Sequence, residues 1–164
     1  MLPPWPGWDG LHPLVIHFPI ALLLVAPVFV LLAIVRPKQS GMFGLSALIL
    51  LVLGTVAAFV AVETGEAAAE LATRTDAINA AIERHASLAE TARNLFAGLT
   101  VLYALVLVLP RAARKFASRG WVTATNTIFL GLLLAGGLVL ANAAHHGGLL
   151  VHKYGLQAML PPGS

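Results

Sequence analysis

The chain contains no cysteine among its 164 residues. This absence excludes disulfides, thiolate metal sites, iron–sulfur clusters and covalently attached c-type haem. Charged residues are also scarce, at 10% of the chain, whereas hydrophobic residues make up 59%. Such a composition is not that of a soluble domain, so it indicates a membrane protein.

Motifs for hydrolytic or nucleotide chemistry are missing as well. The chain has no nucleophile motif, general-base dyad or phosphate-binding loop. Its three methionines, Met1, Met42 and Met159, are scattered, which counts against a thioether copper site. A stand-alone enzyme is therefore less favoured than an electron-transfer protein or a subunit, although the sequence leaves the question open.

Four apolar runs approach or exceed the length needed to cross a bilayer, which is about 20 residues. The expected helices lie at about 12–35, 42–63, 76–110 and 121–146. No helix breaker separates Asp76 from the third apolar run, so this helix should project beyond the outer face. The expected fold is all-α, with residues 1–164 forming a single up-down four-helix membrane bundle.

The distribution of charge predicts the orientation of these helices. The two short loops on one side hold six basic residues and no acidic ones: Arg36, Lys38, Arg111, Arg114, Lys115 and Arg119. All seven acidic residues fall on the other side. Under the positive-inside rule, both termini then lie outside the cytoplasm. We therefore expect a bacterial inner-membrane protein with periplasmic termini, and we expect no nucleic-acid partner. The first apolar run should be retained, because residues 1–11 carry no basic cluster.

Histidines are the ionisable residues that this topology gathers. His12 and His17 open the first apolar run, and each is followed within two residues by a proline. Ionisable groups in membrane helices usually mark a functional site. All six histidines fall on the expected outer side: His12, His17, His85, His145, His146 and His152. We predict that His12, His17, His85 and His145 are ligands. The other two are weaker candidates, since a histidine at a helix end is often an interfacial or capping residue.

The spacing of the first two histidines favours a large ligand. His12 and His17 are about 140° apart around a helix of 3.6 residues per turn, so they face different neighbours rather than one small ion. Haem b fits this geometry, because axial histidines from facing helices of a bundle hold it without cysteine. We predict one or two haems, pairing His12 with His85 and His17 with His145.

Three further residues are expected to assist. Arg84 and Arg93 lie at the wet rim, where they would bind the haem propionates, and Glu63 would orient an imidazole through its second nitrogen.

Several motifs carry a resemblance to a known family. They are His12-Pro-x-x-x-His-Phe-Pro-Ile-Ala-Leu22, Glu63-x-Gly65-Glu66, Ile82-Glu-x-His85 with Ala89, and His145-x-Gly-Gly148-x-Leu-Val151-x-x-x-Gly155. Together they resemble the bacterial four-span membrane proteins grouped as domain of unknown function 2231. The resemblance implies a four-helix inner-membrane protein in a redox or c-type cytochrome context, with suspected haem binding and no established catalytic activity. The family histidines match His12, His17, His85 and His145, whereas His146 falls where the family more often has an apolar residue. The tail departs too, with His152 followed by Tyr154 where the family has an aromatic residue and then a histidine.

Three functions are compatible with these residues. The leading hypothesis is a membrane b-type cytochrome with haem near the outer, periplasmic face. It would pass electrons between quinol, or another membrane partner, and a periplasmic cytochrome or other redox partner. The alternatives are a membrane protein that binds copper or zinc, and a non-catalytic assembly subunit of a homo- or hetero-oligomeric complex in the lipid bilayer. Optical spectra and metal analysis distinguish the b-type cytochrome from the copper- or zinc-binding protein.

Overall fold

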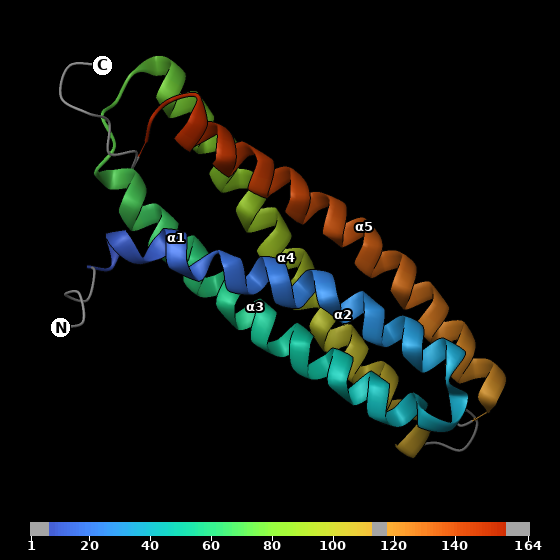
Figure 1. The fold of residues 1–164 in the computed structure, drawn as a ribbon. Coiled ribbons are helices and arrows are strands. Elements are labelled where there is room, and N and C mark those ends of the chain that lie inside the picture. The colour runs from blue at the N-terminus through green and yellow to red at the C-terminus, as the bar shows by residue number, and fades with distance from the viewer. Residues whose placement is uncertain (1–6, 113–117, 157–164) are drawn as a thin grey trace.

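The computed structural model describes residues 7–112 and 118–156, and within them it consists of helices and their connections (Figure 1). The elements in order are η1 (Asp9–Leu11), α1 (His12–Val15), α2 (His17–Val35), η2 (Pro37–Gln39), α3 (Ser40–Glu70), α4 (Asp76–Ala112) and α5 (Arg119–His152). Four helical segments of the described chain are long and apolar enough to cross a membrane, the first being α1 and α2 together. The predicted all-α membrane bundle is confirmed.

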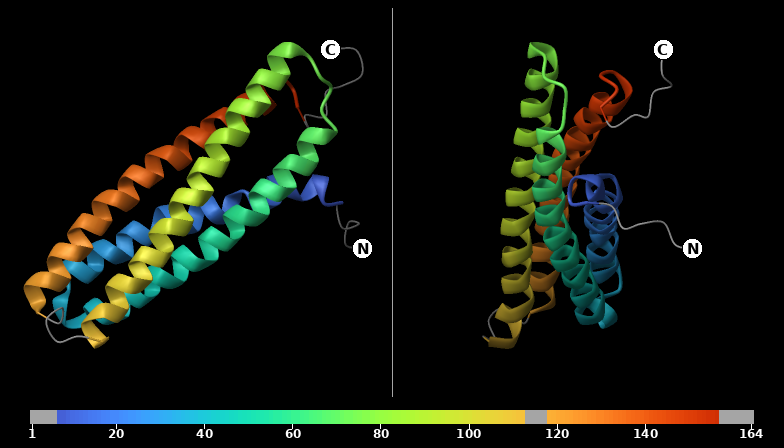
Figure 2. Two further views of the ribbon diagram at one scale, coloured as in Figure 1. Left: turned by 180° about the vertical axis from the view of Figure 1, so that it is seen from behind. Right: turned by 90° about the vertical axis from the view of Figure 1, so that its left-hand side faces the viewer.

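The four long segments run up and down and pack as neighbours in a ring. α2 packs against α3 and α5, and α4 packs against the same two helices. The start of α1, the end of α5 and the α3–α4 connection lie at one end of the bundle (Figure 1). We call this the histidine end. α4 and α5 extend past the start of α1 at this end (Figure 2).

The first segment is divided where a proline removes a backbone donor. α1 stops at Val15 and α2 begins at His17. Pro19 has no N–H to donate to the carbonyl of Val15, and the neighbouring Ile20 N–H to Ile16 O bond is long, at 3.5 Å. Pro27 also lies inside α2, but it does not end the helix.

Three helices run further than the sequence patterns suggested, α4 by only two residues, to Ala112. α3 continues to Glu70 because residues 66–70 are alanine and glutamate, which favour helix. α5 passes through Gly147 and Gly148 to His152. The left-handed residue beyond it is Gly155, with φ 66°, a conformation common just after a helix.

The third long helix is continuous, as the absence of breakers predicted. α4 spans 37 residues. Its start is capped by Thr75, whose Oγ1 accepts the backbone N–H of Ile78 at 3.3 Å.

The bundle has a small interior and an apolar exterior. Leu23, Leu51, Phe96 and Leu133 are buried at its centre. Many large apolar side chains instead point outward, and Leu138 is 74% exposed. Continuous apolar surface on this scale requires an apolar surrounding, and a lipid bilayer supplies it.

Polar side chains bridge the helices inside. The Tyr103 hydroxyl donates to Asn126 Oδ1 at 3.0 Å, linking α4 to α5. The hydroxyls of Thr55 and Thr100 lie 2.8 Å apart and link α3 to α4. Hydrogen bonds of this kind support helix association where no water drives it.

The described basic residues of the predicted inner loops lie opposite the histidine end. Arg36, Lys38 and Arg119 flank the ends of α2 and α5 there. Arg114 and Lys115, also expected in these loops, lie outside the described residues.

Candidate functional site

His12, the first residue of α1, reaches across to α3. Its Nδ1 lies 2.9 Å from the carbonyl oxygen of Ala61 and 3.3 Å from Thr64 Oγ1. A carbonyl can only accept, so Nδ1 carries the proton. The ring lies against Gly65, where an added Cβ would be 2.9 Å from His12 Cε1. Glycine at this position therefore lets the imidazole approach the α3 backbone.

His85 makes the same contact between α4 and α5. Its Nδ1 lies 3.0 Å from the carbonyl oxygen of Ala143, so this nitrogen also carries the proton. The ring lies against Gly147, where an added Cβ would be 2.9 Å from His85 Cε1. Gly147 thus sits inside α5 to make room for a ring from α4, and not to end the helix.

The two imidazoles meet. Their ring centres are 6.4 Å apart and their planes are inclined at 74°. Each ring is half-buried, and each Nδ1–H is held by a backbone carbonyl. Nε2 is then the basic nitrogen of each ring, and neither Nε2 has a hydrogen-bond partner in the described part of the chain. The arrangement presents two imidazoles whose Nε2 atoms are available to a ligand.

The contact partners were not anticipated from the sequence. The contacts of His12 and His85 share one pattern. Each ring meets an alanine carbonyl and, four residues later on the same helix, a glycine: Ala61 with Gly65, and Ala143 with Gly147. An alanine and a glycine four apart lie on the same face of a helix. This spacing, near the end of a span that faces a histidine-bearing helix, is the sequence signal that was available.

The other predicted ligand pair is not brought together. His17 and His145 are both exposed, and their side chains make no hydrogen bond or ring contact with one another. The ring of His145 instead lies 5.6 Å from that of His146, its neighbour in α5. The Nδ1 of His146 contacts the carbonyl of Asn142 at 3.0 Å, within its own helix. His152 is the exposed last residue of α5.

The predicted assisting residues are dispersed. Glu63 is exposed, and the orienting role expected of it is filled at His12 by the Ala61 carbonyl and Thr64. Arg93 lies over the Phe59 ring, 5.2 Å from its centre. Arg84 lines a cavity between α4 and α5.

The donor set has a limited range of chemistry. Across the described residues, no three His, Cys, Asp or Glu side chains converge to hold a metal ion. A closed tetrahedral zinc site needs four such ligands and an open catalytic one needs three. Two facing imidazoles instead suit a centre that takes only two ligands from the protein.

A family model described as predicted membrane protein (DUF2231) matches residues 9–159. The match covers His12, His85 and both glycines that face them. The chain belongs to this family. The resemblance expected from the histidine–proline motif at the start of the chain is thereby confirmed for DUF2231. No curated protein and no solved structure matches the chain.

Proposed function

We propose that this DUF2231 protein is a membrane b-type cytochrome that holds one haem b between His12 and His85 and transfers electrons. The observation that carries the proposal is the meeting of two imidazoles with fixed tautomers, 6.4 Å apart between ring centres. Haem b takes axial histidines from facing helices and needs no cysteine, which agrees with a chain that has none.

The spacing suits two ligands on opposite sides of one ion. Metal–imidazole bonds are about 2 Å long, so two such imidazoles have ring centres roughly 6 Å apart. The separation of His12 and His85 is close to this value. Hydrogen bonds from Nδ1 to backbone carbonyls are the usual way in which proteins fix a ligating histidine and raise the basicity of Nε2.

Each half of the chain contributes one ligand and its support. His12 and His85 would hold the iron, and the Ala61 and Ala143 carbonyls would keep each ring in its tautomer and orientation. When bound, the haem supplies a one-electron couple. Two protein ligands leave no iron position for oxygen, so the site favours electron transfer over oxygen chemistry.

The charge distribution supports a location near the outer face. The basic residues Arg36, Lys38 and Arg119 lie at the opposite end of the bundle from His12 and His85, and basic loops face the cytoplasm. In a bacterial inner membrane the site would then lie on the periplasmic side. Electrons would pass between quinol or another membrane partner and a periplasmic cytochrome or other redox protein.

The test is an optical spectrum of the detergent-purified protein, expressed with ample haem and recorded with and without dithionite. We expect sharp α and β bands on reduction and about one haem per chain by the pyridine haemochrome assay. Parallel metal analysis for copper and zinc tests the non-haem alternative. Wild-type protein that contains no haem, or that contains stoichiometric copper or zinc instead, would refute the proposal. Protein without haem or metal would favour the assembly-subunit alternative.

A further inference from the structure

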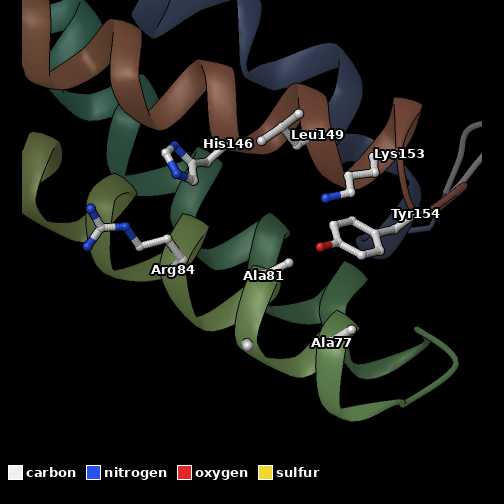
Figure 3. Close-up of a pocket in the computed structure, with 8 residues that line it drawn as sticks. Ala77, Ala81, Arg84, His146, Leu149, Lys153 and Tyr154 are labelled. Carbon is white, nitrogen blue, oxygen red and sulfur yellow. The ribbon is translucent and has the colours of Figure 1, made fainter.

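A cavity of about 350 Å³ lies between α4 and α5 at the histidine end (Figure 3). Three nitrogen-bearing side chains line it: Arg84, His146 and Lys153. Alanines of α4 and Leu149 of α5 form its apolar part, and Tyr154 also lines it. No acidic residue of the described chain is part of the lining. The cavity is therefore basic and apolar together.

The basic groups of this cavity are free to bind an anion. The Arg84 guanidinium makes no hydrogen bond or ion pair with any described residue. The Lys153 Nζ contacts the face of the Tyr154 ring, 5.4 Å from its centre. His146 uses its Nδ1 on the carbonyl of Asn142, which leaves Nε2 available. Two full positive charges without acidic partners favour an anionic ligand.

Exposed leucines lie on the same helix faces as the cavity, deeper in the bundle. Leu95 follows Arg84 by eleven residues, and Leu138 precedes Leu149 by the same number. Eleven residues are about three turns, so each pair shares a helix face, with about 16 Å between its members. Both leucines are exposed, Leu138 at 74%. Exposed apolar surface on both helices therefore begins about three turns from the basic cavity, and Thr91, Asn142 and His145 lie on the same faces between them.

We propose that this cavity binds the phosphate headgroup of an acidic phospholipid, whose acyl chains lie along Leu95 and Leu138. A lysine or arginine near a membrane surface attracts anionic lipid headgroups by about 1 kcal/mol, and the cavity holds one of each. The cavity lies between two helices that are long and apolar enough to cross a membrane, so lipid surrounds the helices next to it, which favours a lipid headgroup over a free anion. The proposal does not depend on haem binding.

The experiment is native mass spectrometry of delipidated protein titrated with phosphatidylglycerol, phosphatidylcholine or inorganic phosphate. The test variant is Arg84→Gln with Lys153→Gln. The matched control is Arg74→Gln, which removes a charge at the same end of the bundle but outside the cavity. We expect phosphatidylglycerol to bind the wild type at least about tenfold more tightly than phosphatidylcholine, and the double variant to lose about 30-fold in affinity. The control should bind like the wild type.

Three results would overturn the proposal. The first is equal binding of phosphatidylglycerol and phosphatidylcholine, or an unchanged double variant. The second is full displacement of the lipid by inorganic phosphate, which would assign the cavity to a free anion. The third is loss of haem from the double variant in the optical spectrum, which would assign Arg84 to the propionates as the sequence predicted. An unchanged circular dichroism spectrum shows that the double variant is folded.

Discussion

In the N-terminal half of the bundle, His12 meets the Ala61 carbonyl across 49 residues of chain. In the C-terminal half, His85 meets the Ala143 carbonyl across 58 residues. Each ring then lies on a glycine one turn further along the partner helix. The two halves thus use one local design, a helix pair that holds an imidazole by its Nδ1, although the chain lengths between the partners differ.

The halves differ at the two residues that directly precede each glycine. Thr64 in α3 is fully buried, and its hydroxyl lies 3.3 Å from His12 Nδ1. The corresponding residue in α5 is His146, which turns its own Nδ1 to Asn142. Glu63 corresponds to His145, and both are exposed.

Three features are common to both halves, and the other nearby residues differ between them. The shared features are the inward imidazole, the alanine carbonyl and the glycine. His145 occupies the outward position that Glu63 occupies in the other half, so its histidine character is not part of the shared design. His12 and His85 are therefore the two histidines that we propose as ligands.

The largest expected effect is loss of the inward imidazoles. His12→Ala and His85→Ala should each reduce haem per protein by more than about tenfold, since each removes one axial ligand. The pyridine haemochrome assay on purified protein measures this. His17→Ala and His145→Ala are the matched controls and should retain wild-type haem. Haem loss in His17→Ala or His145→Ala, with haem retained in His12→Ala and His85→Ala, would show that His12 and His85 are not the ligands.

The next effect concerns the glycines behind the rings. In Gly65→Ala or Gly147→Ala the new Cβ would lie 2.9 Å from a ring carbon, so the imidazole must shift by more than the roughly 0.2 Å that metal–ligand distances tolerate. We expect haem affinity to fall about 10- to 100-fold, equally in both halves, as measured by haem titration of the apoprotein. Gly98→Ala and Gly131→Ala have no atom within 4 Å of the new Cβ and should bind haem normally. Equal haem affinity in all four variants would show that the close approach of each imidazole to its glycine does not matter for haem binding.

A smaller effect is expected where the halves differ. Thr64→Val removes one of two oxygens near His12 Nδ1 but leaves the Ala61 carbonyl. A net hydrogen bond contributes about 1 kcal/mol, so haem affinity should fall about fivefold. His146→Ala, at the matching position, should not change it. Haem titration of the apoprotein measures both affinities. An equal loss of affinity in His146→Ala and Thr64→Val would show that the two positions contribute equally to haem binding.

The smallest effect on the site is expected from a remote hydrogen bond. Tyr103→Phe leaves Asn126 Oδ1 without the hydroxyl that donates to it, which should cost about 1–3 kcal/mol of stability. Thermal unfolding in detergent should show the lower midpoint, and haem per folded protein should be unchanged. A loss of haem per folded protein in Tyr103→Phe would mean that lower stability of the bundle alone is enough to weaken haem binding.

Much of the fold followed from the sequence because membrane helices carry a strong local signal. The apolar runs and the unbroken pattern after Asp76 predicted four long helices, and the structure contains them. The helix ends were less readable. Gly147 and Gly148 looked like a stop, but Gly147 makes room for a ring from another helix, and that requirement is tertiary.

The site was only partly readable for the same reason. The sequence drew attention to His12 and His85, and it paired them. It also predicted His17 and His145 as ligands, because spacing along one helix cannot show which helix face is covered by a neighbouring helix. The shared spacing of alanine and glycine gives no internal repeat in the sequence, because the chain lengths between each histidine and its alanine differ.

The most direct test of the central claim is the low-temperature electron paramagnetic resonance spectrum of the oxidised protein with its haem. Two axial imidazoles would make the ferric haem low-spin, so we expect a low-spin signal in the wild type. In His12→Ala or His85→Ala reconstituted with excess haem, this signal should be replaced by a high-spin one. A low-spin signal that survives both substitutions, or a wild-type spectrum that is high-spin throughout, would contradict the assignment of His12 and His85 as the two ligands of one iron.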